Sequence, residues 1–197
     1  MTVLAKTSIV LASSSRYRRE LLQRLGLPFE SFAPEVDERP LPAEPPRETA
    51  IRLARAKAEA GARKFPTAWV IGSDQVADLD GRAIGKPGTF ERAQQQLRDV
   101  SGHSVLFHTA LSLWNARVER RHERLITTEV AFRRLTDAEI ERYLEREHAL
   151  DVAGSAKSEG LGIALLSRLG GEDPTALVGL PLIALAAMLR AEGFDVP

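Results

Sequence analysis

Strand-like and helix-like segments alternate along the first half of the chain, and this alternation constrains the fold more than any other feature. Short apolar runs at residues 8–12 and 69–73 are typical of buried strands, whereas residues 17–25 repeat apolar side chains at helical spacing. Later, residues 103–114 and 124–132 have the pattern of a strand pair. We therefore predict an α/β fold with a mixed β-sheet.

The same patterns predict the remaining elements. We expect helices over 46–64, 89–100, 136–147 and 181–192, a strand within 27–34, a proline-rich loop over 37–46, and a hairpin over 76–84 that turns at Asp80-Gly81. Residues 161–169 are apolar, and their pattern leaves strand and helix both open.

Length and composition narrow the function classes. The 197 residues fit a single domain over 1–197, and Lys plus Arg equals Asp plus Glu at 27 each. The absence of Cys excludes disulfides, thiolate nucleophiles and zinc fingers, and the zero net charge argues against a nucleic-acid partner. The longest apolar stretch, 176–189, is too short for a membrane span, so we expect a cytoplasmic protein without membrane partners.

One candidate for chemistry is the acidic and amide pair Asp74-Gln75, directly after the apolar residues 69–73. Open α/β sheets bind ligands at the carboxyl ends of their strands. Asp74 could therefore act as a general base on water or bind a divalent metal, and Gln75 could hydrogen-bond a base or a sugar. The alternative is that Asp74 only starts a turn.

Basic and hydroxyl side chains form a second candidate. Ser13, Ser14 and Ser15 lead into a predicted helix that begins with three Arg residues within 16–19, which is unfavourable at a helix N-terminus unless an anion binds there. Lys86, between Gly85 and Pro87, could also bind phosphate. The alternative for both segments is a solvated surface.

Three further groups could complete such a site. Asp37-Glu38 could hold Mg²⁺ or Mn²⁺, Lys57 could point inward from its Ala-rich helix, and Glu159 could accept hydrogen bonds from a base. Alternatively, each of these side chains could simply be solvated. Together with the first two candidates, they suit a nucleotide enzyme, although residues 81–87 lack the spacing of a P-loop.

The ordered set of motifs resembles the Maf family of nucleoside triphosphate pyrophosphatases, and within it the 7-methyl-GTP pyrophosphatase branch. The resemblance covers nearly the whole chain. Its motifs are Leu11-Ala12-Ser13-Ser14-Ser15 with Arg18-Arg19-Glu20-Leu21-Leu22, Asp37-Glu38, Leu53-Ala54 with Lys57-Ala58, Gly72-Ser73-Asp74-Gln75, Gly85-Lys86-Pro87, Ser101-Gly102, Ala153-Gly154-Ser155 with Lys157-Ser158-Glu159-Gly160, and Val178-Gly179-Leu180-Pro181-Leu182.

The resemblance implies a twisted mixed sheet with a cleft between two lobes, similar to inosine triphosphate pyrophosphatases. It implies hydrolysis of the α–β phosphoanhydride of 7-methyl-GTP, which gives 7-methyl-GMP and pyrophosphate and removes a modified nucleotide. A divalent metal cation (Mg²⁺ or Mn²⁺) is the expected cofactor, and homodimerisation is an expectation of the resemblance only.

The resemblance also assigns roles to residues. Asp74 matches the proton acceptor and Glu38 the metal ligand, with Asp37 or Asp74 as its expected helper. Ser13, Arg18, Lys57 and Lys86 match the substrate-binding set. Tyr17, Gln75 and Glu159 match the positions that separate the branches, and the chain departs from many relatives at Arg16, where they often have Pro.

A physical reason supports the choice of base. 7-Methylguanine carries a delocalised positive charge, which the aromatic face of Tyr17 attracts, and Glu159 could accept hydrogen bonds from the guanine edge. Two alternatives stay open: a dTTP/UTP pyrophosphatase of the same family, and a nucleotide-binding inhibitor of septum formation without significant turnover. A third, an RNA-binding module, is disfavoured by the neutral charge.

Overall fold

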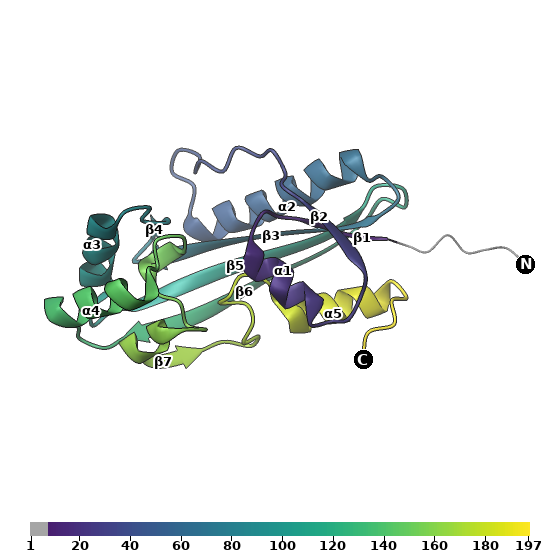
Figure 1. Cartoon of the computed structure of the whole chain (residues 1–197). Coiled ribbons are helices and arrows are strands. Elements are labelled where there is room, and N and C mark those ends of the chain that lie inside the picture. The colour runs from purple at the N-terminus through teal and green to yellow at the C-terminus, as the bar shows by residue number, and fades with distance from the viewer. Residues whose placement is uncertain (1–7) are drawn as a thin grey trace, which may run out of the picture.

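The computed structural model describes residues 8–197, so the first seven residues of the predicted domain lie outside it. Its centre is a seven-stranded mixed sheet in the order β2-β1-β3-β5-β6-β7, with β4 paired to β3 (Figure 1). The strands are β1 (Ile9–Ala12), β2 (Phe29–Phe32), β3 (Trp69–Leu79), β4 (Arg82–Ile84), β5 (Ser104–Asn115), β6 (Arg120–Phe132) and β7 (Leu166–Gly170). The first three pair in parallel and the others are antiparallel, so the sheet is mixed.

Within residues 8–197, five α-helices flank this sheet, and the predicted α/β class with a mixed sheet is confirmed. They are α1 (Arg16–Gln23), α2 (Pro46–Lys64), α3 (Phe90–Val100), α4 (Asp137–Glu147) and α5 (Leu182–Ala191). Among residues 8–197, none of these helices is both long and apolar enough to cross a bilayer.

Local capping explains where several helices begin. Ser15 caps α1 by accepting from the backbone N–H of Arg18, and Thr89 caps α3 in the same way. At α4, Thr136 and Glu139 satisfy each other's backbone N–H groups in a full capping box. These side chains accept hydrogen bonds from backbone N–H groups that otherwise lack a partner at a helix N-terminus. The predicted helix starts agree with the structure to within one or two residues.

The two faces of the sheet are covered differently. Helix α2 packs on one face through Ala50, Ala54 and Ala58. The opposite face carries two hydrophobic clusters: α1 and α5 pack at one end of the sheet, and α3 and α4 at the other (Figure 1). The helices on this face therefore form two separate groups, which agrees with the predicted two lobes.

Two segments differ from their predicted form. Strand β3 was expected to end at Ser73, but it continues to Leu79 because antiparallel pairing with β5 extends from Val70 to Asp78. Residues 161–169, left open between helix and strand, contain both: a short 3-10 helix over Leu161–Leu165 and then strand β7.

The long strand β3 also has a gap along one edge. β1 pairs with it as far as Ile71, and β4 pairs with it from Ala77 onward. β1 and β4 both pair with the edge of β3 that faces away from β5. Residues 72–76 of β3 therefore have no strand beside them on this edge. Successive side chains of a strand point to opposite faces of the sheet. Side chains from both faces of β3 can therefore reach the same space at this gap.

Candidate functional site

A pocket of about 740 Å³ opens at this gap in the sheet edge. Residues from α1, from α2 and the loop before it, from β3 and β4, and from the segments before β7 and before α5 line it. Nine of the residues that the sequence nominated for the site lie in its wall, and Asp37 does not: the nine are Ser13, Tyr17, Arg18, Glu38, Lys57, Asp74, Gln75, Lys86 and Glu159. The fold thus brings together candidates that are spread over almost 150 positions of sequence.

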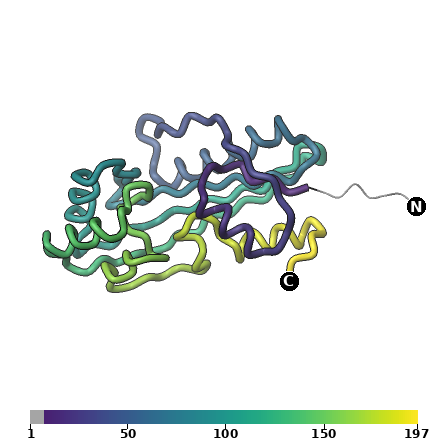
Figure 2. The backbone as a smooth tube through the Cα atoms, in the orientation of Figure 1, coloured from purple at the N-terminus to yellow at the C-terminus, as the bar shows by residue number. Residues whose placement is uncertain are grey.

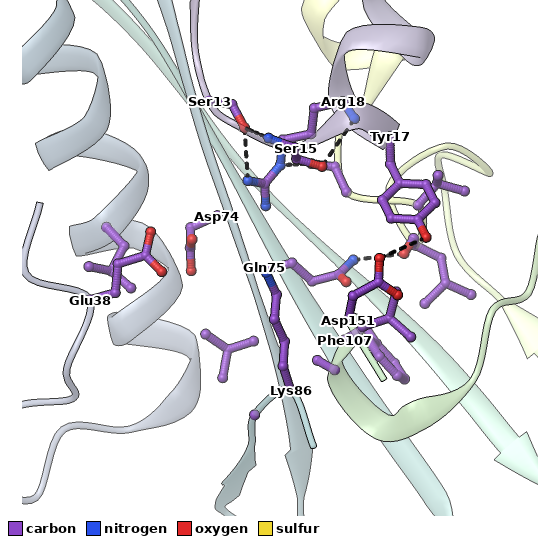
Figure 3. Close-up of a pocket in the computed structure, with 18 of the residues that line it drawn as sticks. Ser13, Ser15, Tyr17, Arg18, Glu38, Asp74, Gln75, Lys86, Phe107 and Asp151 are labelled. Carbon is purple, nitrogen blue, oxygen red and sulfur yellow. Dashed lines mark hydrogen bonds between the residues drawn. The ribbon is translucent and has the colours of Figure 1, made fainter. Parts of the chain in front are cut away.

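The side chains are arranged by type around the pocket. Figure 3 shows Glu38 and Asp74 on one side and Tyr17 with Asp151 on the other. Arg18 enters between them from one direction and Lys86 from the opposite one (Figure 3). An acidic end and an aromatic end are therefore separated by cations.

Lys57 organises the acidic end. Its Nζ lies 2.6 Å from Asp74 Oδ1 and 2.6 Å from Glu38 Oε1, and the lysine is buried. Partial burial acts to raise the pKa of Glu38, but the hydrogen bond and charge of Lys57 outweigh it and hold that pKa below its usual value. An ammonium group has three N–H donors, so one remains for a ligand in the pocket.

Asp74 faces α2 because of its place in β3, not because it ends a strand. The sequence analysis expected a strand end here, and the structure corrects this: Asp74 lies in the middle of β3 and pairs with Ala110. The strand that ends near Asp74 is β1, the parallel neighbour of β3, whose last residue pair with β3 is at Ile71. Asp74 is therefore accessible from the pocket although its own strand continues.

A glycine allows α2 to approach β3 closely enough for the Lys57–Asp74 pair. A Cβ atom placed on Gly72 would lie 2.2 Å from the carbonyl oxygen of Ala54 and 2.5 Å from the nitrogen of Ala58. No side chain fits there without moving backbone atoms. Gly72 thus sets the distance between the helix that carries Lys57 and the strand that carries Asp74.

Arg18 is a cation whose direct partners are neutral. Its Nε donates to the carbonyl of Gly179 at 2.8 Å, and its Nη1 reaches Ser13 Oγ at 3.4 Å. Burial lowers the pKa of Arg18, while the more distant Asp74 and Glu38 act in the opposite direction. A guanidinium held this way, at a helix start with no acidic residue in its first turn, is suited to an anion.

Glu38 and Lys86 lie in loops near the acidic end and are held less firmly than Lys57 and Asp74. Glu38 lies in the loop between β2 and α2, which arches beside the start of α2 (Figure 2). Lys86 is exposed, in the segment that follows β4. Asp37, the expected helper of Glu38, is not in the pocket wall: its carboxylate is bound by Arg39 in solvent, which lowers its pKa.

Gln75 uses its amide nitrogen inside the protein. This Nε2 lies 2.9 Å from each of three acceptors, the carbonyls of Ala176 and Leu177 and the hydroxyl of Thr109. It therefore ties β3 to the segment before α5, and only its Oε1 can accept a hydrogen bond from a ligand. Glu159 is exposed at the pocket rim, so its carboxylate stays free for solvent or ligand.

The sequence analysis missed one acidic residue at the aromatic end. Asp151 lines the pocket, and the hydroxyl of Tyr17 donates to its Oδ2 at 3.2 Å. Asp151 lies 134 positions from Tyr17. The signal in the sequence is weak: a lone carboxylate two residues before the motif Ala153-Gly154-Ser155.

The acidic end also fits a divalent cation. Mg²⁺ takes oxygen ligands, usually one or two carboxylates with phosphate oxygens and water. Asp74 and Glu38 bind the same Lys57 nitrogen, so their oxygens lie close together. Within the described part of the chain, no group of three or more acidic or His side chains could hold a metal alone. A cation here would need ligands from the substrate.

Comparisons with known proteins agree on one family. The family model described as "Maf-like protein" matches residues 8–192. A protein of Xanthomonas axonopodis pv. citri named "7-methyl-GTP pyrophosphatase" is 59% identical over 189 residues, which cover 96% of this chain and 98% of that protein. Proteins with the same name are 58% identical in Burkholderia thailandensis, over 96% of this chain and 91% of the relative, and 57% identical in Aromatoleum aromaticum, over 97% and 98%.

Proposed function

Because the chain belongs to the Maf-like protein family, we propose that it is a nucleoside triphosphate pyrophosphatase that hydrolyses 7-methyl-GTP. The reaction cleaves the α–β phosphoanhydride and gives 7-methyl-GMP and pyrophosphate. Relatives named for this activity are similar over nearly the whole chain. The enzyme is then a hydrolase acting on acid anhydrides that removes a modified nucleotide.

The observation that carries the proposal is the position of Arg18 in the same pocket as the Lys57–Asp74 pair. A half-buried guanidinium with only neutral direct partners supports binding of an anion. A carboxylate in the same pocket supports proton transfer from water. A triphosphate that extends between these groups would place an anhydride close to Asp74.

We assign the roles on this basis. Arg18, Lys86 and Ser13 bind the phosphates, and Lys57 contributes its remaining N–H while it holds Asp74 in place. Asp74 orients a water molecule and accepts its proton as the water attacks phosphorus. Pyrophosphate leaves with its charge compensated by the surrounding cations.

Glu38 and Asp74 would hold a divalent cation, Mg²⁺ or Mn²⁺, at the acidic end of the pocket. Such a cation supplies charge neutralisation for the phosphates when it is bound. Glu38 has an ionised carboxylate for this purpose at neutral pH, since Lys57 keeps its pKa low. Lys57 must then share Asp74 and Glu38 with the cation.

The base binds at the aromatic end in this proposal. Tyr17 attracts the positively charged ring of 7-methylguanine. Glu159 and the Oε1 of Gln75 are acceptors that suit the N1–H and amino group of a guanine edge. The competing dTTP/UTP activity would gain less from these groups, because a pyrimidine has neither that charge nor that pair of donors.

Analysis of the products tests the reaction. The protein is incubated with 7-methyl-GTP and Mg²⁺ or Mn²⁺, and nucleotides and phosphates are separated by chromatography. We expect 7-methyl-GMP and pyrophosphate in equal amounts. Release of orthophosphate with 7-methyl-GDP would contradict cleavage between the α and β phosphates, and binding without turnover would favour the inhibitor of septum formation.

Three sequence-based expectations remain predictions beside this function. They are a single domain over 1–197, a cytoplasmic location and a homodimer without nucleic-acid or membrane partners. Limited proteolysis, cell fractionation and sedimentation would test them.

A further inference from the structure

A charged residue of the chain itself lies on the aromatic ring at the base end of the pocket. The guanidinium of Arg16 lies over the ring of Tyr17, with its central carbon 4.7 Å from the ring centroid. One of its nitrogens donates to the Tyr17 hydroxyl at 2.8 Å and lies 3.8 Å from Asp151 Oδ2. A planar, delocalised cation therefore contacts an aromatic side chain and a carboxylate together.

Asp151 is fixed from the protein side by a different cation. The Nζ of the buried Lys157 lies 3.4 Å from Asp151 Oδ1 and reaches the carbonyl of Glu147. Partial burial acts to raise the pKa of Asp151, but Lys157 and Tyr17 hold it below its usual value, so the group is ionised at neutral pH. Lys157 is packed inside the protein. Because it pairs with Oδ1 of Asp151, the other carboxylate oxygen, Oδ2, faces Tyr17.

Arg16 is held much less firmly than Lys157. Its side chain is 65% exposed, and its pairing with Asp151 is at the limit of ion-pair distance. Exposed pairs of this kind contribute little stability, because solvent screens the charges and the long side chain loses freedom. A ligand with the same kind of charge could therefore take its place.

We propose that Tyr17 and Asp151 form the subsite for the positive charge of 7-methylguanine, and that Arg16 is the resident cation displaced by the base. This inference rests on the proposed function. Methylation at N7 gives the purine a planar, delocalised positive charge, the same class of group as a guanidinium. An unmethylated guanine would lose the contact between Arg16 and Asp151 without replacing its charge, so the exchange selects the methylated base.

Binding of the product nucleotides tests the exchange without requiring turnover. Dissociation constants for 7-methyl-GMP and GMP are measured by isothermal titration calorimetry with wild type, Arg16→Ala and Asp151→Asn. We expect Arg16→Ala to tighten 7-methyl-GMP binding by about two- to tenfold, because no resident cation competes. Asp151→Asn should lower the preference for 7-methyl-GMP over GMP by a similar factor.

Two variants control for general charge effects. Arg19→Ala removes an exposed charge from the same helix as Arg16, and Glu145→Gln removes an exposed carboxylate from α4, neither of them in the pocket wall. Both should keep the wild-type preference between the two nucleotides. Thermal melts confirm that all variants are folded.

Two results would overturn the inference. One is weaker 7-methyl-GMP binding in Arg16→Ala, which would mean that Arg16 only supports Tyr17. The other is an equal change for both nucleotides in Asp151→Asn. Turnover of 7-methyl-GTP is measured separately: a protein that hydrolyses it but shows either result keeps the proposed function and loses only this inference.

Discussion

Lys57 is the residue on which the geometry of the pocket depends most. It holds two carboxylates from different segments at 2.6 Å each, and it is buried together with Asp74. Removing one partner of a buried ion pair is far more costly than the net contribution of the pair, because the remaining charge is left without compensation.

We therefore expect Lys57→Met to lower the free energy of unfolding by about 3–5 kcal/mol and to abolish turnover. Urea unfolding followed by circular dichroism measures the first effect. Lys64→Met, an exposed lysine at the end of the same helix, is the matched control and should cost much less. Equal losses for the two variants would show that the buried pair has no special importance.

Asp74→Asn keeps the size of the side chain and its place in β3 but removes the proton acceptor. We expect pyrophosphate release from 7-methyl-GTP to fall by about 10²- to 10⁴-fold, with nucleotide binding retained. Steady-state kinetics together with calorimetry separate the two effects. Asp137→Asn, an exposed carboxylate at the start of α4, is the control. Wild-type turnover in Asp74→Asn would mean that the base assignment is wrong.

At the residue scale, the sequence predicted which residues line the pocket better than it predicted their contacts. Nine nominated residues line the pocket and Asp37 does not. The nine could be nominated because their motifs are recognisable in order along the chain. Asp151 was missed because its contact with Tyr17 joins residues 134 positions apart, and local pattern carries no information on such pairs. The direction of the Gln75 amide could not be predicted either, because its acceptors are two backbone carbonyls and the Thr109 hydroxyl, all distant in sequence.

At the scale of elements, Glu44 fastens the loop that carries Glu38 to helix α2. Its carboxylate accepts from Arg52, from Thr49 and from the backbone N–H of Leu41. The hydrogen bonds from Arg52 contribute most to lowering the pKa of Glu44 from 4.5 to about 2. A carboxyl with a depressed pKa stabilises the folded state above its unfolded pKa, and this stabilisation is lost as the pH falls toward the folded value.

The wild-type protein should therefore be more stable than Glu44→Gln near neutral pH, and the difference should shrink as the pH falls from about 4.5 toward 2. Thermal melts of both proteins across this range measure it. A constant difference in Tm between pH 6 and pH 3 would mean that Glu44 does not stabilise the loop through its charge.

The contact between α2 and β3 gives a second prediction at this scale. Gly72→Ala places a methyl group 2.2 Å from the Ala54 carbonyl oxygen, so helix and strand must separate. Overpacking of this kind costs about 1–3 kcal/mol or more. Turnover should fall as well, since Lys57 moves away from Asp74. Gly85→Ala, where a Cβ meets no atom within 4 Å, is the control for stability in urea unfolding. Equal stability of the two variants would contradict the close packing.

The elements themselves were largely predictable because their signals are local. The capping box at Thr136 and Glu139 and the turn at Asp80-Gly81 both appear where the sequence indicated. The length of β3 was not predictable, because it depends on pairing with β5 over residues that are distant in sequence. The same pairing corrected the position of Asp74 from a strand end to a strand centre.

At the scale of the whole molecule, the pocket results from how the sheet is assembled. β1 ends and β4 begins on the same edge of β3, and the gap between them lies between two groups of helices. The Lys57–Asp74 pair therefore meets the gap from the α2 side, and Tyr17 with Asp151 meets it from the other. This arrangement matches a ligand with phosphates at one end and a charged base at the other.

The most direct test of this match is the kcat/KM for pyrophosphate release from 7-methyl-GTP, GTP, UTP and dTTP under identical conditions with Mg²⁺ or Mn²⁺. A pocket built as described should give the highest value for 7-methyl-GTP, a lower value for GTP and the lowest for the two pyrimidines. Equal values for 7-methyl-GTP and GTP, or a preference for UTP or dTTP, would contradict recognition of a positively charged purine.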